Sequence, residues 1–303
     1  MKSSNIGGQA VMEGVMMRNA DKYAVAVRKT DGEIVVKTEE YKGIVQNKKI
    51  RSLPIIRGVF SFIDSMVLGM STLTYSASFF MDEEEEEKDE KKDSVMMGLT
   101  IACSVVMAVA IFMILPYFLS QLFRKFTDST TLITLLEGAV RLVIFFGYIL
   151  LISRMKDIQR VFMYHGAEHK CINCIEHGME LNVENVLKSS RLHKRCGTSF
   201  LFIVMIVSII FFLFIRIESP IWRVVFRLLL IPVIAGVSFE FIRLAGKSEN
   251  KLVILLSKPG MMLQKLTTRE PDASMAEVAI ASVEAVFDWR AYLKENFGWQ
   301  EKV

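Results

Sequence analysis

Four long apolar runs limit what this chain can fold into more than any other feature of its sequence. The runs cover residues 95–119, 132–152, 199–217 and 221–241. An α-helix of about 20 apolar residues crosses the hydrocarbon core of a bilayer and satisfies its own backbone hydrogen bonds there. We therefore expect a mainly α-helical, polytopic membrane protein with about four transmembrane helices and the lipid bilayer as its first partner.

A fifth apolar stretch, residues 53–81, differs from these four runs because charged residues interrupt it. Arg57 and Asp64 lie within it, and serine and threonine are frequent in its second half. This pattern favours an interfacial or re-entrant amphipathic helix over a full span. The strongly acidic residues 82–94 that follow predict a solvated linker.

The N-terminal residues 1–52 predict a small β element ahead of the membrane part. Two runs rich in β-branched residues flank Asp31-Gly32, and Asp-Gly in this setting is a strong β-hairpin signal. The glycine-rich residues 7–14 predict a structured turn, because glycine adopts backbone conformations that other residues avoid. No Gly-Lys-Ser/Thr follows these glycines, so we expect neither a Walker phosphate loop nor a nucleotide cofactor.

The distribution of lysine and arginine predicts which segments face the cytosol. Basic residues concentrate in residues 153–198 and 242–303 and are scarce in the connections after the first and third runs. Loops rich in lysine and arginine remain on the cytosolic side of a membrane. We therefore expect two transmembrane hairpins, residues 95–152 and 199–241, with the N-terminus, the loop 153–198 and the C-terminus in the cytosol.

The C-terminal residues 242–303 predict a cytosolic helical segment. Residues 252–266 are too short and too basic to span, and Pro259-Gly260 predicts a turn after a short helix. Apolar residues recur at helical spacing farther on and predict an amphipathic helix over 272–296. Its apolar face comprises Met275, Val278, Ala279, Val283 and Phe287.

The second apolar run carries two charges of opposite sign. Glu137 and Arg141 are four residues apart, so on a helix they share one face and can pair. Charges at this depth are costly and face a protein interior or a wet cavity. The pair therefore predicts either a structural ion pair or the polar lining of a transport path.

The loop 153–198 holds the residues best suited to chemistry. All four histidines of the chain and three of its four cysteines lie there. His165 and His169 are four residues apart, so on a helix both imidazoles can reach one metal ion. Glu168 completes an H-x-x-E-H pattern, in which the carboxylate acts as general base. We expect zinc or another divalent metal at His165 and His169, with Glu168 as the catalytic residue.

The remaining ligands are less well determined by the sequence. Helical geometry places Glu176 near the stripe formed by His165 and His169, and His193 is a second candidate to complete the metal site. A C-x-x-C pair at residues 171–174, joined by His193 or Cys196, is an alternative structural zinc site. A buried polar network without metal, or Cys196 acting as nucleophile with a histidine base, also fits this pattern.

Several stretches resemble the bacterial YqhQ family. They are GGQAVMEGVMMR at 7–18, YHGAEHK at 164–170, VENV at 183–186, RCGTSF at 195–200 and TTREP at 267–271. The motifs are long, occur in the same order and cover nearly the whole chain. The resemblance implies a multi-pass protein of the bacterial cytoplasmic membrane, of uncharacterised function and often catalogued as a predicted metal-dependent enzyme.

The resemblance also implies that the N-terminal motif belongs with the histidine loop. Gln9, Glu13 and Arg18 are then expected to dock against the His165–His169 segment on the cytosolic face, and Arg195 and Cys196 join them as motif residues. The sequence departs from the family pattern at Cys171, where threonine is typical, and at Lys194, where proline is typical. Both departures weaken the C-x-x-C zinc site more than the histidine site.

Three functions remain open from the sequence. The first is a metal-dependent hydrolase with its site on the cytosolic face. The second is a non-enzymatic docking factor for another membrane complex, such as the protein translocation or insertion machinery, and the third is a transporter or channel formed by a homo-oligomer. The net charge of +4 and the lack of interleaved aromatic residues argue against direct nucleic-acid recognition.

Overall fold

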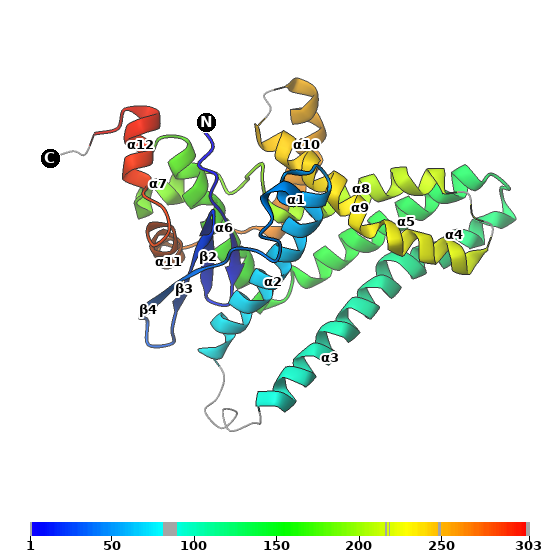
Figure 1. The fold of residues 1–303 in the computed structure, drawn as a ribbon, viewed down its shortest axis with the longest axis horizontal. Coiled ribbons are helices and arrows are strands. Elements are labelled where there is room, and N and C mark those ends of the chain that lie inside the picture. Colours follow the sequence, from blue (N-terminus) through cyan, green and yellow to red (C-terminus); the bar gives the residue numbers. More distant parts are fainter. Residues whose placement is uncertain (1, 81–89, 216, 218, 248–249, 301–303) are drawn as a thin grey trace. The chain divides into compact units, whose positions relative to one another are not determined.

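A computed structural model describes residues 2–80, 90–215, 217, 219–247 and 250–300 (Figure 1). The chain is mainly helical and divides into two compact units. The first unit comprises Met1–Phe80, Ser153–Ile203 and Ala235–Val303, and the second comprises Met81–Ile152 and Val204–Ile234. The predicted linker 82–94 lies largely outside the described residues, and helix α3 begins at Glu90.

Within the described residues, five helices are long and apolar enough to cross a membrane. They are Ile56–Ser78, Gly98–Lys125, Thr130–Ile152, Gly197–Phe214 and Ile221–Gly246. Four of them cover most of each of the four predicted runs, and the chain therefore has helices suited to a multi-pass membrane protein. The fifth is α2 (Ile56–Ser78), which the sequence predicted as interfacial and which is the least apolar of the five.

The second unit contains the first two predicted spans and parts of the others. Its elements are α3 (Glu90–Val109), η2 (Ala110–Ile114), α4 (Leu115–Gln121), η3 (Leu122–Lys125) and α5 (Thr130–Ile152), followed by parts of α8 (Gly197–Phe214) and α9 (Pro220–Lys247). The π-helical turn η2 ends just before Pro116, which lacks a backbone N–H. The first span therefore continues past the proline instead of ending there.

A buried charge cluster joins three helices of the second unit. Glu137 on α5 accepts hydrogen bonds from Arg141 at 2.9 Å and from Arg227 on α9 at 2.5 Å. Arg141 also donates to Ser208 Oγ on α8 at 2.9 Å, and the ring of Phe212 lies beneath both guanidinium groups. All three charged side chains are buried. The pair expected from the sequence is thus part of a larger cluster that links α5, α8 and α9.

We predict that Glu137→Ala strongly destabilises the protein. The substitution leaves two buried guanidinium groups without their shared counter-charge, and breaking a buried pair in this way costs about 3–5 kcal/mol. The midpoint of thermal unfolding in detergent should fall clearly below that of the parent. Glu184→Ala is the matched control, because Glu184 forms an exposed pair with Lys188 that contributes little. Equal midpoints for Glu137→Ala and the control would contradict the cluster's structural role.

In the first unit, four described strands form an antiparallel sheet in sequence order. They are β1 (Gly7–Val11), β2 (Gly14–Asn19), β3 (Lys22–Arg28) and β4 (Ile34–Glu40). The predicted hairpin is present as β3–β4, and Gly32 adopts a φ of +90° in its turn. The glycine-rich segment forms a second hairpin, β1–β2, where the sequence predicted only a turn.

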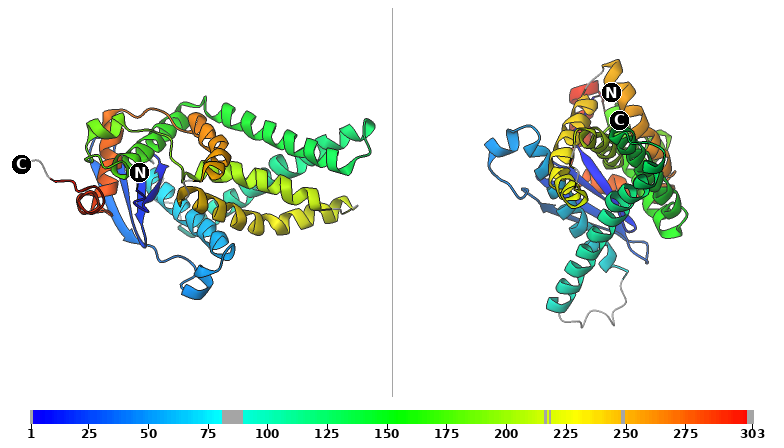
Figure 2. Two further views of the ribbon diagram at one scale, coloured as in Figure 1. Left: turned by 90° about the horizontal axis from the view of Figure 1, so that it is seen from above. Right: turned by 90° about the vertical axis from the view of Figure 1, so that its right-hand side faces the viewer.

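Side chains alternate across this sheet and bury both of its faces. Val11, Met16, Tyr23, Val25 and Val27 cluster with Leu68 of α2 on one face. On the other face, residues including Val15, Met17, Ala24 and Ala26 share a core with α6 (Lys156–Glu176) and α11 (Ala273–Glu284). Figures 1 and 2 show the blue strands with the cyan α2 on one side and the green α6 on the other. Segments from three distant parts of the chain therefore form one three-layered body.

Helix α2 is fixed to this body by polar contacts as well as by Leu68. Gln9 donates to Thr72 at 3.0 Å, and the buried Asp64 accepts from Tyr41 and from the amide of Ile44. At the start of the helix, Arg57 forms an ion pair with Glu240 of α9. Three of the polar residues that interrupted the apolar pattern, Asp64, Thr72 and Ser76, are thus buried on the face of α2 that meets protein.

The C-terminal helices differ from the prediction in two respects. Helix α10 (Lys251–Thr267) continues through Pro259, so the predicted turn at Pro259-Gly260 is wrong. Both residues fit inside the helix because Pro259 is exposed while Gly260 packs closely against Ser199. The predicted helix 272–296 is divided into α11 and α12 (Trp289–Phe297), and the short helices α1 (Lys48–Ser52) and α7 (Val183–Lys188) complete the unit.

Candidate functional site

Helix α6 supplies three of the site residues, and Gly166 within it allows the backbone of the segment after α10 to approach closely. A Cβ on Gly166 would lie 2.0 Å from the carbonyl oxygen of Arg269. The amide of Arg269 donates to the carbonyl of Phe162 at 2.8 Å, which fixes the segment after α10 against α6. Gly166 is thus required where two backbones meet.

Two histidines and a cysteine converge beside this contact. The potential ligand atoms of His165, His169 and Cys196 all lie within 4.8 Å of one another. His165 Nε2 is 3.3 Å from Cys196 Sγ, and the centroids of the two imidazole rings are 4.4 Å apart. Cys196 immediately precedes α8, so the end of a candidate span supplies the third group. In the part of the chain that the structure describes, this is the group suited to hold a metal ion.

Backbone carbonyls orient both imidazoles. His165 Nδ1 lies 2.8 Å from the carbonyl oxygen of Thr267, and His169 Nδ1 lies 2.6 Å from that of Arg191. A carbonyl only accepts, so each Nδ1 carries the proton and donates it. In the neutral form of each ring, Nε2 is then the nitrogen with a lone pair available to a metal, an arrangement typical of metal-ligating histidines.

Glu168 lies at the edge of this group. Its Oε2 is 4.0 Å from His165 Nε2, and its side chain is 6% exposed. Gly8 of β1 packs against it, because a Cβ on Gly8 would lie 3.1 Å from Glu168 Cγ. The first strand of the sheet therefore packs against the side chain of the residue predicted as the general base.

The three groups alter one another's protonation. Burial alone would raise the pKa of Cys196, but the imidazoles of His165 and His169 hold it well below its usual value. Burial alone would lower the pKa of His165, yet Cys196 and Glu168 raise it to about 9. The pKa of His169 is raised in the same way. The protein without metal thus favours a thiolate beside a protonated imidazole.

We predict that Cys196 is a thiolate at neutral pH in the metal-free protein. Its lowered pKa means that the thiolate persists as the pH falls below the value of about 8.5 at which a free cysteine titrates. The ultraviolet thiolate absorbance of the parent minus that of Cys196→Ser, recorded during an acid titration, should report the fraction of Cys196 that is a thiolate. His165→Ala should shift the midpoint upward, and an ordinary thiol midpoint in the parent would contradict the pairing. Burial raises the pKa of Cys171 and Cys174, so these thiols should not contribute.

Glu176 and His193, predicted as further ligands, lie in a separate cluster instead. His193 Nε2 is 3.5 Å from Glu176 Oε2, and the ring of His193 is 5.7 Å from that of His169. Arg195 and both the amide and hydroxyl of Ser4 also donate to Glu176. Burial would raise the pKa of Glu176, but His193 and Arg195 hold it below its usual value. Glu176 lies two helical turns beyond His169, so Cys196 takes the third position near the histidines.

The three N-terminal motif residues dock at different places. Glu13 pairs with Arg160 and accepts from Tyr164, one residue before His165 on α6. Gln9 instead bonds to α2, and Arg18 donates to the carbonyls of Ala20 and Tyr41. The expectation that all three meet the His165–His169 segment therefore holds in the structure only for Glu13. Gly8 is the motif residue that lies against Glu168.

The cysteines of the C-x-x-C pair do not join the metal-ligand group. Cys171 and Cys174 are buried in the hydrophobic core shared by the sheet, α6 and α11. Cys174 also donates to the carbonyl of Glu180 at 3.3 Å. His177 bonds to the carbonyl of its own helix at Asn173. These residues therefore support the fold around the site.

Sequence reasoning missed the residues that hold the site in place. Gln264 of α10 donates to the carbonyl of His193 and to Ser199, and its own oxygen accepts from the amide of His193. The carbonyls of Arg191 and Thr267 orient the histidines, and carbonyls leave no trace in residue type. The TTREP motif at 267–271 was the available signal, because it begins at Thr267.

Comparisons with known proteins identify relatives but no activity. Residues 53–289 match the family described as "Protein of unknown function (DUF1385)". The chain is 36% identical over 301 residues to "Uncharacterized protein YqhQ" of Bacillus subtilis (strain 168), which covers 96% of this chain and 94% of that protein. No solved structure matches the chain. The family match includes His165, Glu168, His169 and Cys196.

Proposed function

The chain belongs to the YqhQ proteins of unknown function (DUF1385), as the sequence motifs predicted, and from its site we propose that it is a membrane-bound, metal-dependent hydrolase. One observation carries the proposal: His165, His169 and Cys196 place their ligand atoms within 4.8 Å of one another. Three protein ligands with a fourth position open are typical of catalytic zinc sites. Structural zinc sites instead close the fourth position with protein.

The donor chemistry and its surroundings fit a divalent ion such as zinc. The thiolate form of Cys196 and the unprotonated Nε2 atoms are the ligand forms that zinc takes. The carbonyls of Thr267 and Arg191 hold the imidazoles in the required tautomer. A bound ion would supply Lewis acidity, polarising water or an oxygen of the scissile group.

Glu168 has the position expected of a general base in such a site. Its carboxylate lies beside His165, its side chain is buried, and Gly8 packs against its Cγ. A base acts when it lies within hydrogen-bond reach of the proton it accepts, directly or through one water. Glu168 would take the proton from the attacking water and pass it to the leaving group. Its substitution by glutamine should therefore abolish turnover while leaving metal binding intact.

The packing of the first unit supports a topology with four crossings. The sheet and α6 share a core, although three candidate spans, 56–78, 98–125 and 130–152, separate them along the chain. Three crossings would put the sheet and α6 on opposite sides of the bilayer, whereas two crossings keep them together. Helix α2 would then lie in the interface, with its outer apolar residues toward lipid.

This topology extends to the ends of the chain and to its location. Helices α8 and α9 provide two further crossings, which return α11 to the side of the sheet it packs on. The excess of lysine and arginine in these segments favours the cytosolic side for both termini and for the site. The membrane would be the bacterial cytoplasmic membrane.

Metal content tests the proposal directly. Detergent-purified protein should carry close to one zinc, iron or manganese ion per chain, measured by elemental mass spectrometry. The His165→Ala/His169→Ala variant and Cys196→Ser should each lose most of it, because three ligands are needed to retain the ion. His177→Ala is the matched control, since His177 bonds only within α6 and should leave the metal content unchanged.

The absence of metal from parent and variants alike would contradict the hydrolase. That result would instead favour the second function predicted from the sequence, a non-enzymatic docking factor for a membrane complex such as the translocation or insertion machinery. The charge cluster at Glu137 gives the transporter no support, because its three charged side chains are buried and paired.

A further inference from the structure

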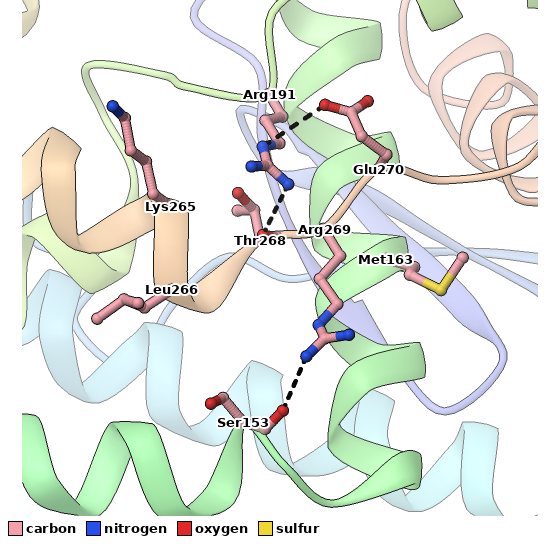
Figure 3. A pocket seen from close by; sticks show the side chains of 8 residues that line it. All are labelled: Ser153, Met163, Arg191, Lys265, Leu266, Thr268, Arg269 and Glu270. Atoms are coloured by element: carbon pink, nitrogen blue, oxygen red, sulfur yellow. Dashed lines mark hydrogen bonds and ion pairs between the residues drawn. The ribbon is translucent and has the colours of Figure 1, made fainter.

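The first unit also has a polar pocket beside the histidine group, and the proposed chemistry does not use it. It is an open pocket of about 510 Å³, and Figure 3 shows the side chains that line it. Arg191, Lys265 and Arg269 line it together with one acidic residue, Glu270. The pocket therefore carries a net positive charge, which favours an anionic ligand.

The cations of the pocket are only partly neutralised. Arg269 donates to the carbonyl of Ser153 at 3.0 Å, and Arg191 donates to the carbonyl of Thr268 at 3.2 Å (Figure 3). Glu270 lies 3.6 Å from Arg191 but forms its shorter pair, at 2.8 Å, with Lys170. Lys265 is exposed at the rim. Guanidinium groups suit phosphate because they present paired N–H donors.

Two of the residues that line the pocket lie close in sequence to the ends of candidate spans. Ser153, one of its lining residues, directly follows Ile152, where the candidate span α5 ends. Arg191 lies six residues before Gly197, where the candidate span α8 begins. Basic pockets at the cytosolic ends of transmembrane helices are suited to lipid headgroups.

Helix α10 leads from an apolar surface into this pocket. Its exposed side chains Leu252, Leu255, Leu256 and Met262 recur at helical spacing, and Leu266 continues the stripe into the pocket lining. Along one edge of this stripe lie Lys251, Lys258 and Lys265, each seven residues from the next and all exposed. An apolar stripe edged by lysines is the pattern of a helix that lies in a membrane interface containing anionic lipid.

We propose that the pocket binds a phosphate group presented by an anionic phospholipid. The apolar stripe of α10 lies among the acyl chains, its lysines lie at headgroup level, and Arg191, Lys265 and Arg269 contact the phosphate. The pocket is distinct from the histidine group, and the proposal does not depend on a bound metal. A headgroup bound there lies against Arg191, whose carbonyl orients His169, and against Thr268, which follows the residue whose carbonyl orients His165.

Calorimetry on the detergent-purified full chain tests this proposal with three probes: dioctanoyl phosphatidylglycerol, dioctanoyl phosphatidylcholine and inorganic phosphate. Phosphatidylglycerol should bind more tightly than either of the others. The binding free energy that one Lys or Arg contributes near a membrane surface corresponds to about five-fold in affinity. Lys265→Gln should therefore weaken phosphatidylglycerol binding about five-fold, and Lys265→Gln/Arg269→Gln about twenty-five-fold. Lys294→Gln, the same change on exposed α12, should leave it unchanged.

The outcomes separate the sources of the phosphate and the two proposals. Equal binding of the two lipids, or unchanged binding by Lys265→Gln, overturns the pocket assignment. Inorganic phosphate that binds as tightly as phosphatidylglycerol overturns the lipid source. The exposed Lys265 donates no hydrogen bond within the described structure, so its single variant should fold normally. Phosphatidylglycerol binding should also survive in His165→Ala/His169→Ala, which tests the pocket independently of the metal.

Discussion

The burial of the N-terminal sheet on both of its faces is the constraint on which the rest of the first unit depends. An isolated four-stranded meander of this size has little core of its own, and it is stable here because α2 covers one face while α6 and α11 cover the other. These partners come from three regions of the chain separated by candidate spans. The sheet therefore determines which parts of the chain must meet, and through them where the site lies.

The candidate site follows from this packing because no single segment contains it. Helix α6 supplies His165, Glu168 and His169, Cys196 is the residue before α8, and the last residue of α10 supplies the carbonyl that orients His165. At the site, Gly8 and Gly166 are two positions where neighbouring backbone comes too close for a side chain. The charge cluster of Glu137, Arg141 and Arg227 plays a comparable part in the second unit, where it joins three helices.

Much of this organisation could be predicted from local patterns, and the remainder depends on long-range contacts. The length of the apolar runs identified the candidate spans, and Asp-Gly between β-branched runs identified the β3–β4 hairpin. Helical periodicity identified the apolar face of α11, since burial on one face leaves a period in the sequence. The spacing of His165 and His169 placed them together for the same reason. The choice of Cys196 over Glu176 near them, and the divergence of Gln9 and Arg18 from Glu13, depend on how distant segments pack. The turn predicted at Pro259 was wrong because an exposed proline in a packed helix destabilises the helix less than the general rule that proline ends a helix implies.

The central claim is that the sheet, α6 and the C-terminal helices lie on one side of the membrane, with α2 not crossing it. Labelling of single cysteines by a membrane-impermeant maleimide, in sealed vesicles of known orientation, tests it most directly. Suitable exposed positions are Lys22 beside β3, Lys188 at the end of α7 and Asp128 between α4 and α5. The account predicts that cysteines at Lys22 and Lys188 react from the same side and that a cysteine at Asp128 reacts from the other. Labelling at Lys22 and Lys188 from opposite sides would contradict it, because the sheet could not then pack against α6.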